Sequence, residues 1–296
     1  MFRAAYGIAS NFTFPVVISR RAISGKCGSS LGAFVIVNEE GWILTAGHII
    51  DQIQKLIADE RTYLDYESKK GTIEADPTLS PKEKRKKVRD LGTFKVEATA
   101  RGSVWLSFPD VKLVDCSYYM PADIAVGRLD PFDPKWVTTY PKFKDPLKPF
   151  ESGASLCKLG FPFHSIVPTW DSTTNTFNLP ADAIPIPRFP IDGIFTRIAN
   201  VNPPQGTSAP IPIKMIETSS PGLRGQSGGP TFDTQGTVWA IQSKTAHLPL
   251  GFSPPVPSGK AGEKEHQFLN VGLGVHPETF LALLDKKNVK YNLASY

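Results

Sequence analysis

Short apolar runs separated by turns dominate the hydrophobic pattern of this chain. A first group comprises residues 14–19, 32–37, 41–44, 103–108, 111–114 and the run that follows Asp123. A second group comprises residues 155–159, 193–198, 213–217, 229–232, 237–243 and 268–275. Runs of this length bounded by Gly, Pro, Asn or Ser are typical of β-strands, because helices need longer periodic segments. The pattern therefore predicts an all-β chain with two groups of strands.

Two segments carry a helical pattern instead. Apolar residues recur every three or four positions from residue 51 onward. Further along, Ser80, Pro81 and Glu83 form a capping box that opens a second, strongly basic helix. Residues 51–92 are therefore predicted to be a helical hairpin inserted into the β fold. Residues 277–287 predict one more helix, since a proline opens the segment and an apolar face follows it.

The composition agrees with short strands and many turns. The 296 residues include 24 Gly and 27 Pro, and 41% are hydrophobic, which suffices for one large or two small β domains. A net charge of +5 permits an acidic partner without requiring one. No run of about 18 apolar residues is present, so no membrane span is expected. The first ten residues make a poor signal peptide.

The cysteine content favours a reducing compartment. The three cysteines, Cys27, Cys116 and Cys157, are widely spaced. An odd number cannot pair completely within one chain, whereas secreted domains usually pair their cysteines. Reduced thiols and a cytoplasmic location are therefore expected. A metal site needs more ligands at shorter spacing, so we expect neither a metal nor another cofactor.

The candidate chemistry centres on Ser227, which stands in the glycine-rich segment 224–230. A serine hydroxyl attacks a carbonyl only with a base beside it and with donors for the oxyanion that forms. Alone, the segment also fits a plain turn. However, His48 ends an apolar run through a small-residue turn, and Asp123 directly precedes another apolar run. His, Asp and Ser in this order, each in a suitable setting, favour nucleophilic catalysis.

The three motifs resemble those of the trypsin-like (chymotrypsin-fold) serine peptidases. They are Thr-Ala-Gly-His at 45–48, Asp-Ile-Ala-Val at 123–126 and Gly-Gln-Ser-Gly-Gly-Pro at 225–230. The chain order His, Asp, Ser is that of this family. Within the family, residues 227–243 are most similar to bacterial, HtrA-like members. The PDZ domain that follows in those members is not expected here. The resemblance covers most of the chain.

The resemblance implies a chymotrypsin-like double barrel, with two six-stranded antiparallel β-barrels. The expected parts are an N-terminal lobe at 1–130 containing the helical insertion at about 51–92, a connector at 131–149, and a C-terminal lobe at 150–296 with its helix at about 277–287. It also implies a serine endopeptidase acting on protein or peptide substrates. The alternative is a protein-binding module that uses the same fold without cleaving.

The resemblance assigns a role to each motif residue. Ser227 attacks a peptide carbonyl, His48 accepts its proton, and Asp123 holds the His48 ring. The backbone N–H groups of Gly225 and Ser227 stabilise the oxyanion. Substrate-contacting residues are expected in two segments: Pro221, Gly222, Leu223, Arg224, Gln242, Ser243 and Lys244.

The sequence gives less information about which substrate side chain is preferred before the scissile bond. Pro221 stands where basic-specific members keep a carboxylate, so cleavage after Lys or Arg is disfavoured. Gly222 and Leu223 favour a small or apolar side chain before the scissile bond. An acidic side chain remains the alternative, because three basic residues lie near the expected pocket: Arg224, Lys244 and His247.

Gln226 departs from the digestive members of the family, which carry an aspartate there. Glutamine cannot form the ion pair with a freed N-terminus that activates those enzymes, so control by loops or by a partner protein is expected. The candidate elements are the loops 162–193 and 245–266 and the helical insertion. A solvated basic face on the insertion is favoured over an acidic partner. Nucleic acid is disfavoured, because no aromatic side chains interrupt the basic run.

Overall fold

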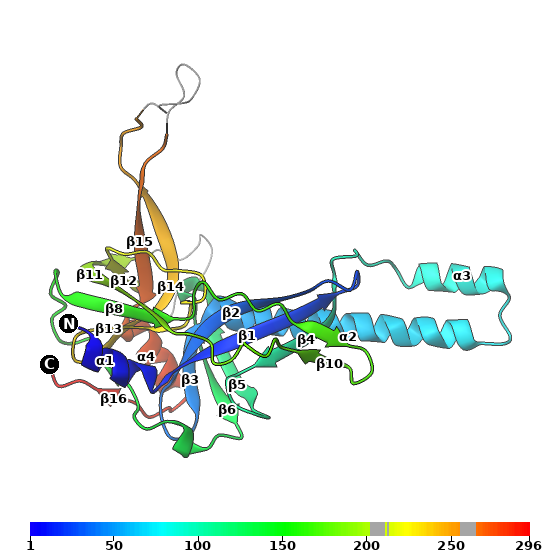
Figure 1. Cartoon of the computed structure of the whole chain (residues 1–296), viewed down its shortest axis with the longest axis horizontal. Coiled ribbons are helices and arrows are strands. Elements are labelled where there is room, and N and C mark those ends of the chain that lie inside the picture. The colour runs from blue at the N-terminus through cyan, green and yellow to red at the C-terminus, as the bar shows by residue number, and fades with distance from the viewer. Residues whose placement is uncertain (202–210, 212, 255–264) are drawn as a thin grey trace.

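The computed structural model describes residues 1–201, 211, 213–254 and 265–296, and two large β-sheets form its framework (Figure 1). The first sheet has six antiparallel strands in the order β4-β1-β2-β3-β6-β5. These strands are β1 (Thr13–Ala22), β2 (Cys27–Ile36), β3 (Trp42–Ala46), β4 (Thr99–Trp105), β5 (Lys112–Tyr119) and β6 (Ile124–Asp130). Helix α2 (Gly47–Ala75) packs against both edge strands, β4 and β5, which covers edges that would otherwise expose unpaired backbone groups.

The second sheet contains eight strands, six of which close into a ring. Its order is β13-β8-β11-β12-β15-β14-β7-β16, and a further pairing of β13 with β14 completes the ring. The strands are β7 (Lys142–Phe143), β8 (Ser155–Gly160), β11 (Phe189–Asn200), β12 (Lys214–Thr218), β13 (Pro230–Phe232), β14 (Val238–Pro249), β15 (Phe268–Val275) and β16 (Asn292–Leu293). A small separate hairpin is formed by β9 (Thr169–Asp171) and β10 (Thr176–Asn178). The expected all-β double-barrel architecture is confirmed.

The inserted helical hairpin and the C-terminal helix are also present. They are α2 with α3 (Pro81–Asp90), and α4 (Pro277–Lys286). The predicted capping box exists, since the Ser80 side chain and the Glu83 side chain each accept the backbone N–H of the other residue. Two short 3-10 helices, η1 (Met120–Ala122) and η2 (Pro134–Trp136), flank β6.

Helix α2 begins four residues earlier than the sequence predicts, so that His48 lies in its first turn. The early turns are anchored by buried Ile49, Ile50, Ile53 and Leu56. Beyond Leu56 no residue of α2 is buried, and α3 has no buried residue at all. The outer part of the hairpin therefore extends away from the two sheets (Figure 1).

An N-terminal helix that the sequence did not predict, α1 (Arg3–Ser10), packs against the sheets through Ala5 and Ala9, both fully buried. These alanines belong to a single hydrophobic cluster that runs through both sheets. It includes Phe34 and Val126 from the first sheet and Phe232 from the second. The two barrels thus share one continuous core, which fixes their relative placement and hence the cleft between them.

His276 caps helix α4 as a buried group. Its Nδ1 accepts the Glu278 backbone N–H at 3.1 Å, and the residue is 2% exposed. Burial lowers the pKa of His276 to about 4. In the unfolded chain the pKa returns to about 6.5, so unfolding takes up a proton between these values. The stabilisation is complete above about pH 6.5 and is lost as the pH falls through 4.

We expect this group to remove about 3 kcal/mol from the free energy of unfolding between pH 7 and pH 4. Urea unfolding of the wild type and of His276→Asn over this range measures the effect. Asparagine keeps a capping oxygen but does not titrate. The wild type loses stability toward pH 4 and the variant does not lose this contribution. The difference between the unfolding free energy of the wild type and that of His276→Asn should therefore narrow or reverse toward pH 4. Parallel curves would show that His276 does not contribute to acid destabilisation.

Candidate active site

His48 and Asp123 lie side by side because two paired strands end together. Strand β3 pairs with β6 so that Ala46 lies opposite Ile124. His48 follows β3 directly, in the first turn of α2, and Asp123 directly precedes β6. Asp123 adopts a left-handed backbone conformation with φ 55°, which Asp and Asn tolerate better than other side chains. This backbone turn places its carboxylate against His48.

The Asp123 carboxylate holds His48 at two points. Its Oδ1 accepts the His48 backbone N–H at 2.8 Å, and its Oδ2 lies 2.9 Å from His48 Nδ1. Ser243 Oγ donates a further hydrogen bond to Oδ2 at 2.6 Å. An ionised carboxylate can only accept, so Nδ1 carries the ring proton and Nε2 is left able to accept one.

The electrostatics of this pair favour a basic imidazole. The hydrogen bond to Asp123 raises the pKa of His48 above 6.5, against the opposing effect of burial. Burial by itself would raise the pKa of Asp123. The hydrogen bonds and the charge of His48, together with the hydrogen bond from Ser243, outweigh this effect of burial, so the pKa of Asp123 is lowered. The His48 side chain is 45% exposed and that of Asp123 is 18% exposed. The imidazole is therefore open to a substrate, while the carboxylate is sheltered.

Ser227 lies on a loop wedged between the two sheets. A Cβ added at Gly228, whose φ is 84°, would lie 2.0 Å from the Ala33 carbonyl oxygen of β2. A Cβ at Gly229 would lie 2.0 Å from the Leu159 carbonyl oxygen of β8. The Ala33 N–H also donates to the Ser227 carbonyl at 2.8 Å. Only glycine fits this close approach, and the approach brings Ser227 against β2 of the first sheet.

Two residues of this loop, Gly225 and Ser227, line the same pocket as His48 and have backbone N–H groups to consider. The N–H groups of Gln226 and Gly228 donate to backbone carbonyls at 2.9 and 2.8 Å. For those of Gly225 and Ser227, no acceptor is found within the described part of the chain. Both of these residues line a pocket with His48. Paired, unoccupied N–H groups beside a hydroxyl are what oxyanion stabilisation requires.

The Ser227 hydroxyl is turned toward Ser243, to whose carbonyl it donates at 3.3 Å. Among the described residues no hydrogen bond joins Ser227 Oγ to His48 Nε2. A serine side chain has one heavy-atom torsion, so rotation about χ1 is the motion that would redirect the hydroxyl. Such contacts commonly tighten only when substrate is bound.

Two pockets flank Ser227. One, of about 630 Å³, lies on the His48 side and is lined also by Ser29, Ser30, Leu31, Phe161, Phe163 and His164. The other, of about 490 Å³, is lined by all seven residues that the sequence assigned to substrate contact, together with Thr245, His247 and Asn270. We call these the His48-side pocket and the 221–224 pocket. The structure thus gathers the assigned residues around one site.

Several residues of the His48-side pocket were missed by sequence reasoning. Phe163 and His164 come from the predicted loop 162–193, which in the structure also contains β9, β10 and the start of β11, and Ser29 and Ser30 come from β2. A long loop is a general sign of function, but no local pattern marks these positions. They reach the pocket because the two sheets pack against each other there.

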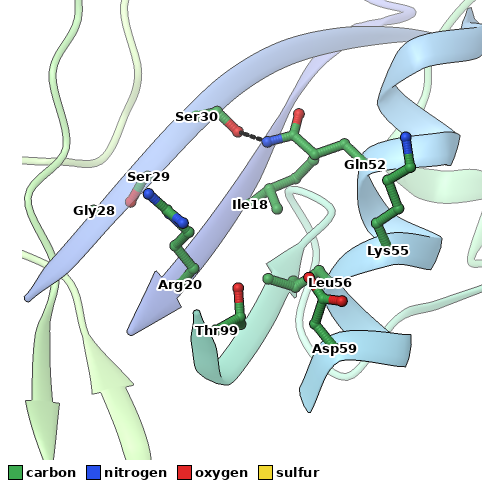
Figure 2. A pocket seen from close by; sticks show the side chains of 10 residues that line it. All are labelled: Ile18, Arg20, Gly28, Ser29, Ser30, Gln52, Lys55, Leu56, Asp59 and Thr99. Carbon is green, nitrogen blue, oxygen red and sulfur yellow. Dashed lines mark hydrogen bonds between the residues drawn. The ribbon is translucent and has the colours of Figure 1, made fainter. Parts of the chain in front are cut away.

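A further pocket of about 470 Å³ continues the cleft onto helix α2 (Figure 2). It shares Ser29 and Ser30 with the His48-side pocket. Helix α2 forms one wall, where Gln52 Nε2 donates to Ser30 Oγ at 2.7 Å, and Arg20 of β1 lies on the opposite wall (Figure 2). The cleft therefore extends from Ser227 past His48 to the inserted helix.

Gln226 is completely buried beneath the serine loop. Its Oε1 accepts the Leu223 backbone N–H at 3.0 Å, and its Nε2 lies 3.5 Å from the Phe189 carbonyl oxygen. Both hydrogen bonds are uncharged; the first joins Gln226 to the neighbouring Leu223 and the second joins it to the start of β11. The position is occupied by a neutral side chain that already has partners in the folded chain.

Within the described residues, no group of His, Cys, Asp and Glu side chains is arranged to hold a metal ion. The helices described include none with the length and apolar character needed to cross a membrane. All three cysteines are free thiols, and Cys157 is buried. Burial raises the pKa of the Cys157 thiol to about 11, so this group is neutral and unreactive at ordinary pH.

No protein-family model and no curated protein matches the sequence. Solved structures do match. An HtrA-type protease, AlgWS227A with a decapeptide, superposes with a TM-score of 0.50 at 12% identity, covering 97% of this chain and 66% of the other. The same protease with a tripeptide gives 0.46 at 15% identity, covering 97% and 63%. The active form of the Rv3671c protease from M. tuberculosis gives 0.46 at 12% identity, covering 97% and 86%.

The match at a TM-score of 0.50 shows the fold alone, which is a chymotrypsin-like double barrel. The chain spans just under two thirds of the length of the AlgW chains that it matches. At 12% identity this likeness extends to the fold and not to the activity.

Proposed function

We propose that this protein is a serine endopeptidase that hydrolyses peptide bonds in protein substrates. The observation that carries the proposal is the His48–Asp123 pair, which leaves His48 Nε2 free beside a pocket that it shares with Ser227. The N–H groups of Gly225 and Ser227, which have no acceptor among the described residues, supply the second requirement of acyl transfer. The structurally similar protease AlgWS227A holds a bound decapeptide, which supports a peptide substrate.

In this mechanism Ser227 Oγ attacks the peptide carbonyl as His48 Nε2 takes up its proton. Asp123 keeps the His48 ring in the required tautomer and stabilises the imidazolium that forms. The oxyanion accepts hydrogen bonds from the N–H groups of Gly225 and Ser227. His48 then returns the proton to the leaving amine, and water releases the acyl group by the reverse sequence. Residues 242–244 pair with the substrate backbone by β-augmentation.

The open cleft favours cleavage inside a chain over removal of terminal residues. Because His48 must reach the leaving amine, the residues after the scissile bond enter the His48-side pocket. The pocket beside α2 gives them room to continue (Figure 2). The residues before the scissile bond enter the 221–224 pocket on the other side of Ser227. A substrate chain can thus extend in both directions.

A second candidate function is a protein-binding module that does not cleave. The observation in its favour is the Ser227 hydroxyl, which donates to the Ser243 carbonyl at 3.3 Å and is not bonded to His48 within the described residues. The complete set of His48, Asp123 and Ser227 favours the enzyme.

Regulation by a partner protein forms part of the proposal. Buried, uncharged Gln226 offers no carboxylate for an activating N-terminus, and the hairpin of α2 and α3 provides a projecting surface for a partner (Figure 1). Three free thiols support a reducing, cytoplasmic compartment. N-terminal trimming is expected to leave activity unchanged under this proposal.

A proteome-derived peptide library, incubated with the purified chain with and without lysate of its host, tests the function. Cleavage by the chain alone identifies an active endopeptidase. Cleavage only with lysate, and dependent on Ser227, identifies a regulated one. Retention of peptides without any cleavage in either condition would support the binding module instead.

A further inference from the structure

A buried lysine lies behind the 221–224 pocket without a counter-ion. Lys158 of β8 is 1% exposed. Its Nζ donates to Thr218 Oγ1 at 2.9 Å, to Ser220 Oγ at 2.7 Å and to the Ser220 carbonyl. Within the described residues no carboxylate forms an ion pair with it. A buried ammonium that lacks a paired anion is unfavourable, even when its hydrogen bonds are satisfied.

The position of Lys158 relates it to the proposed substrate site. Ser220, which accepts two of its hydrogen bonds, immediately precedes Pro221 in the pocket wall. On the other side, a Cβ added at Gly272 would lie 2.8 Å from Lys158 Nζ. Gly272 pairs with Thr245, which also lines the pocket. The ammonium therefore lies directly behind two walls of the 221–224 pocket.

The pocket itself carries positive charge only. Arg224 and Lys244 line it and are exposed, and His247 stands beside Asn270 on the same wall. No Asp or Glu is found among its described lining residues. A cavity with charges of one sign attracts the opposite charge, and a low-dielectric wall strengthens that attraction.

We propose that the 221–224 pocket binds an acidic side chain, Glu or Asp, at the residue before the scissile bond. The inference rests on the proposed peptidase function and names its substrate class. Arg224 and Lys244 attract the carboxylate at the mouth of the pocket, and Lys158 supplies a buried positive charge behind the wall. The bound carboxylate provides the anion that Lys158 lacks.

The protonation of Lys158 agrees with this role. Burial lowers its pKa to about 8, and the exposed carboxylate of Asp192 on neighbouring β11 acts in the opposite direction. The ammonium is therefore mostly charged at neutral pH.

Four peptides that differ only in the residue before the scissile bond, Glu, Gln, Leu or Lys, test the proposal on the wild-type chain. We expect kcat/KM for Glu to exceed that for Gln by at least about tenfold, since the two are alike in shape and differ in charge. Lys should be cleaved least. Equal or faster cleavage of the Gln or Leu peptide would overturn the proposal.

Two lysine variants separate the buried charge from general effects. Lys158→Met should reduce the Glu-over-Gln ratio about tenfold. Lys144→Met is the matched control, because Lys144 is also buried, at 5% exposure, but bonds to the Tyr296 carbonyl outside the pocket. It should leave the ratio unchanged. A Lys158→Met ratio equal to that of the wild type would show that the buried charge is not involved.

If Lys158→Met does not fold, the double variant Arg224→Gln with Lys244→Gln takes its place and should lower the Glu-over-Gln ratio in the same way.

Binding measurements distinguish failure of this inference from failure of the proposed function. In a Ser227→Ala chain, the Glu peptide should bind at least about tenfold more tightly than the Gln peptide, whether or not the wild type cleaves either. Tight Glu-selective binding without wild-type cleavage would refute the peptidase and keep the acidic specificity. Cleavage without preference for Glu would support the peptidase and refute the acidic specificity.

Discussion

Replacing Ser227 with alanine is expected to lower kcat by about 10⁵- to 10⁶-fold and to abolish labelling by a fluorophosphonate. The hydroxyl is the only group of the proposed set that can form the acyl-enzyme, and the neighbouring N–H groups cannot replace it. The substitution removes one weak hydrogen bond, to Ser243, so the fold should be retained. Peptide hydrolysis and gel-based labelling measure the two effects.

Ser165→Ala serves as the control for this experiment. Ser165 is exposed and lines the His48-side pocket together with Ser227. It lies between β8 and β9 and has no role in the proposed mechanism. Its variant should be labelled as strongly as the wild type. Labelling that persists in Ser227→Ala and disappears in Ser165→Ala would place the nucleophile elsewhere.

Replacing Asp123 with asparagine is expected to lower kcat by about 10⁴-fold. Asparagine tolerates the left-handed backbone that Asp123 adopts, so the turn should persist. Its amide N–H₂ can donate to His48 Nδ1, which would leave the proton on Nε2 and prevent that atom from accepting one from Ser227.

The same substitution should change the pH dependence. In the wild type the hydrogen bond to Asp123 raises the pKa of His48 above 6.5, and only the neutral imidazole acts as a base. Wild-type kcat/KM should therefore fall as the pH drops through a value above 6.5. Loss of the carboxylate lowers that pKa, so the remaining activity of Asp123→Asn should persist to lower pH.

Asp51→Asn is the matched control for this pair. Asp51 lies one turn further along α2, pairs with Lys55 at 2.7 Å, and raises the pKa of His48 only through its charge. Its variant should keep nearly full kcat, with a small downward shift of the acid limb. An equal loss in both carboxylate variants would indicate a general charge effect instead of ring orientation by Asp123.

Much of the fold could be predicted from local sequence. The capping box at Ser80 and Glu83 forms as expected, and β15 has the predicted limits of 268–275. Other elements were underestimated. Helix α2 starts at Gly47 because buried Ile49 and Ile50 fix its first turn against the first sheet, and this packing overrides the low helix propensity of glycine. Strand β14 continues to Pro249 because β15 pairs with it along that length.

The short helix α1 was not predicted from the sequence at all. Eight residues do not form a stable helix alone. The helix is stabilised by Ala5 and Ala9, which are buried against the rest of the chain. Such an element depends on contacts that local sequence does not reveal.

By itself, the sequence determined the all-β class, the inserted helices and the three motifs around His48, Asp123 and Ser227, because each depends on residues that are neighbours along the chain. Only the tertiary structure decided what surrounds them. The pairing of β3 with β6 sets the His48–Asp123 geometry, and the packing of the two sheets forms the pockets on either side of Ser227. It also places Lys158 behind a pocket wall, with no carboxylate paired to it among the described residues. These features depend on distances between segments far apart in sequence, and such distances are set by packing and strand pairing.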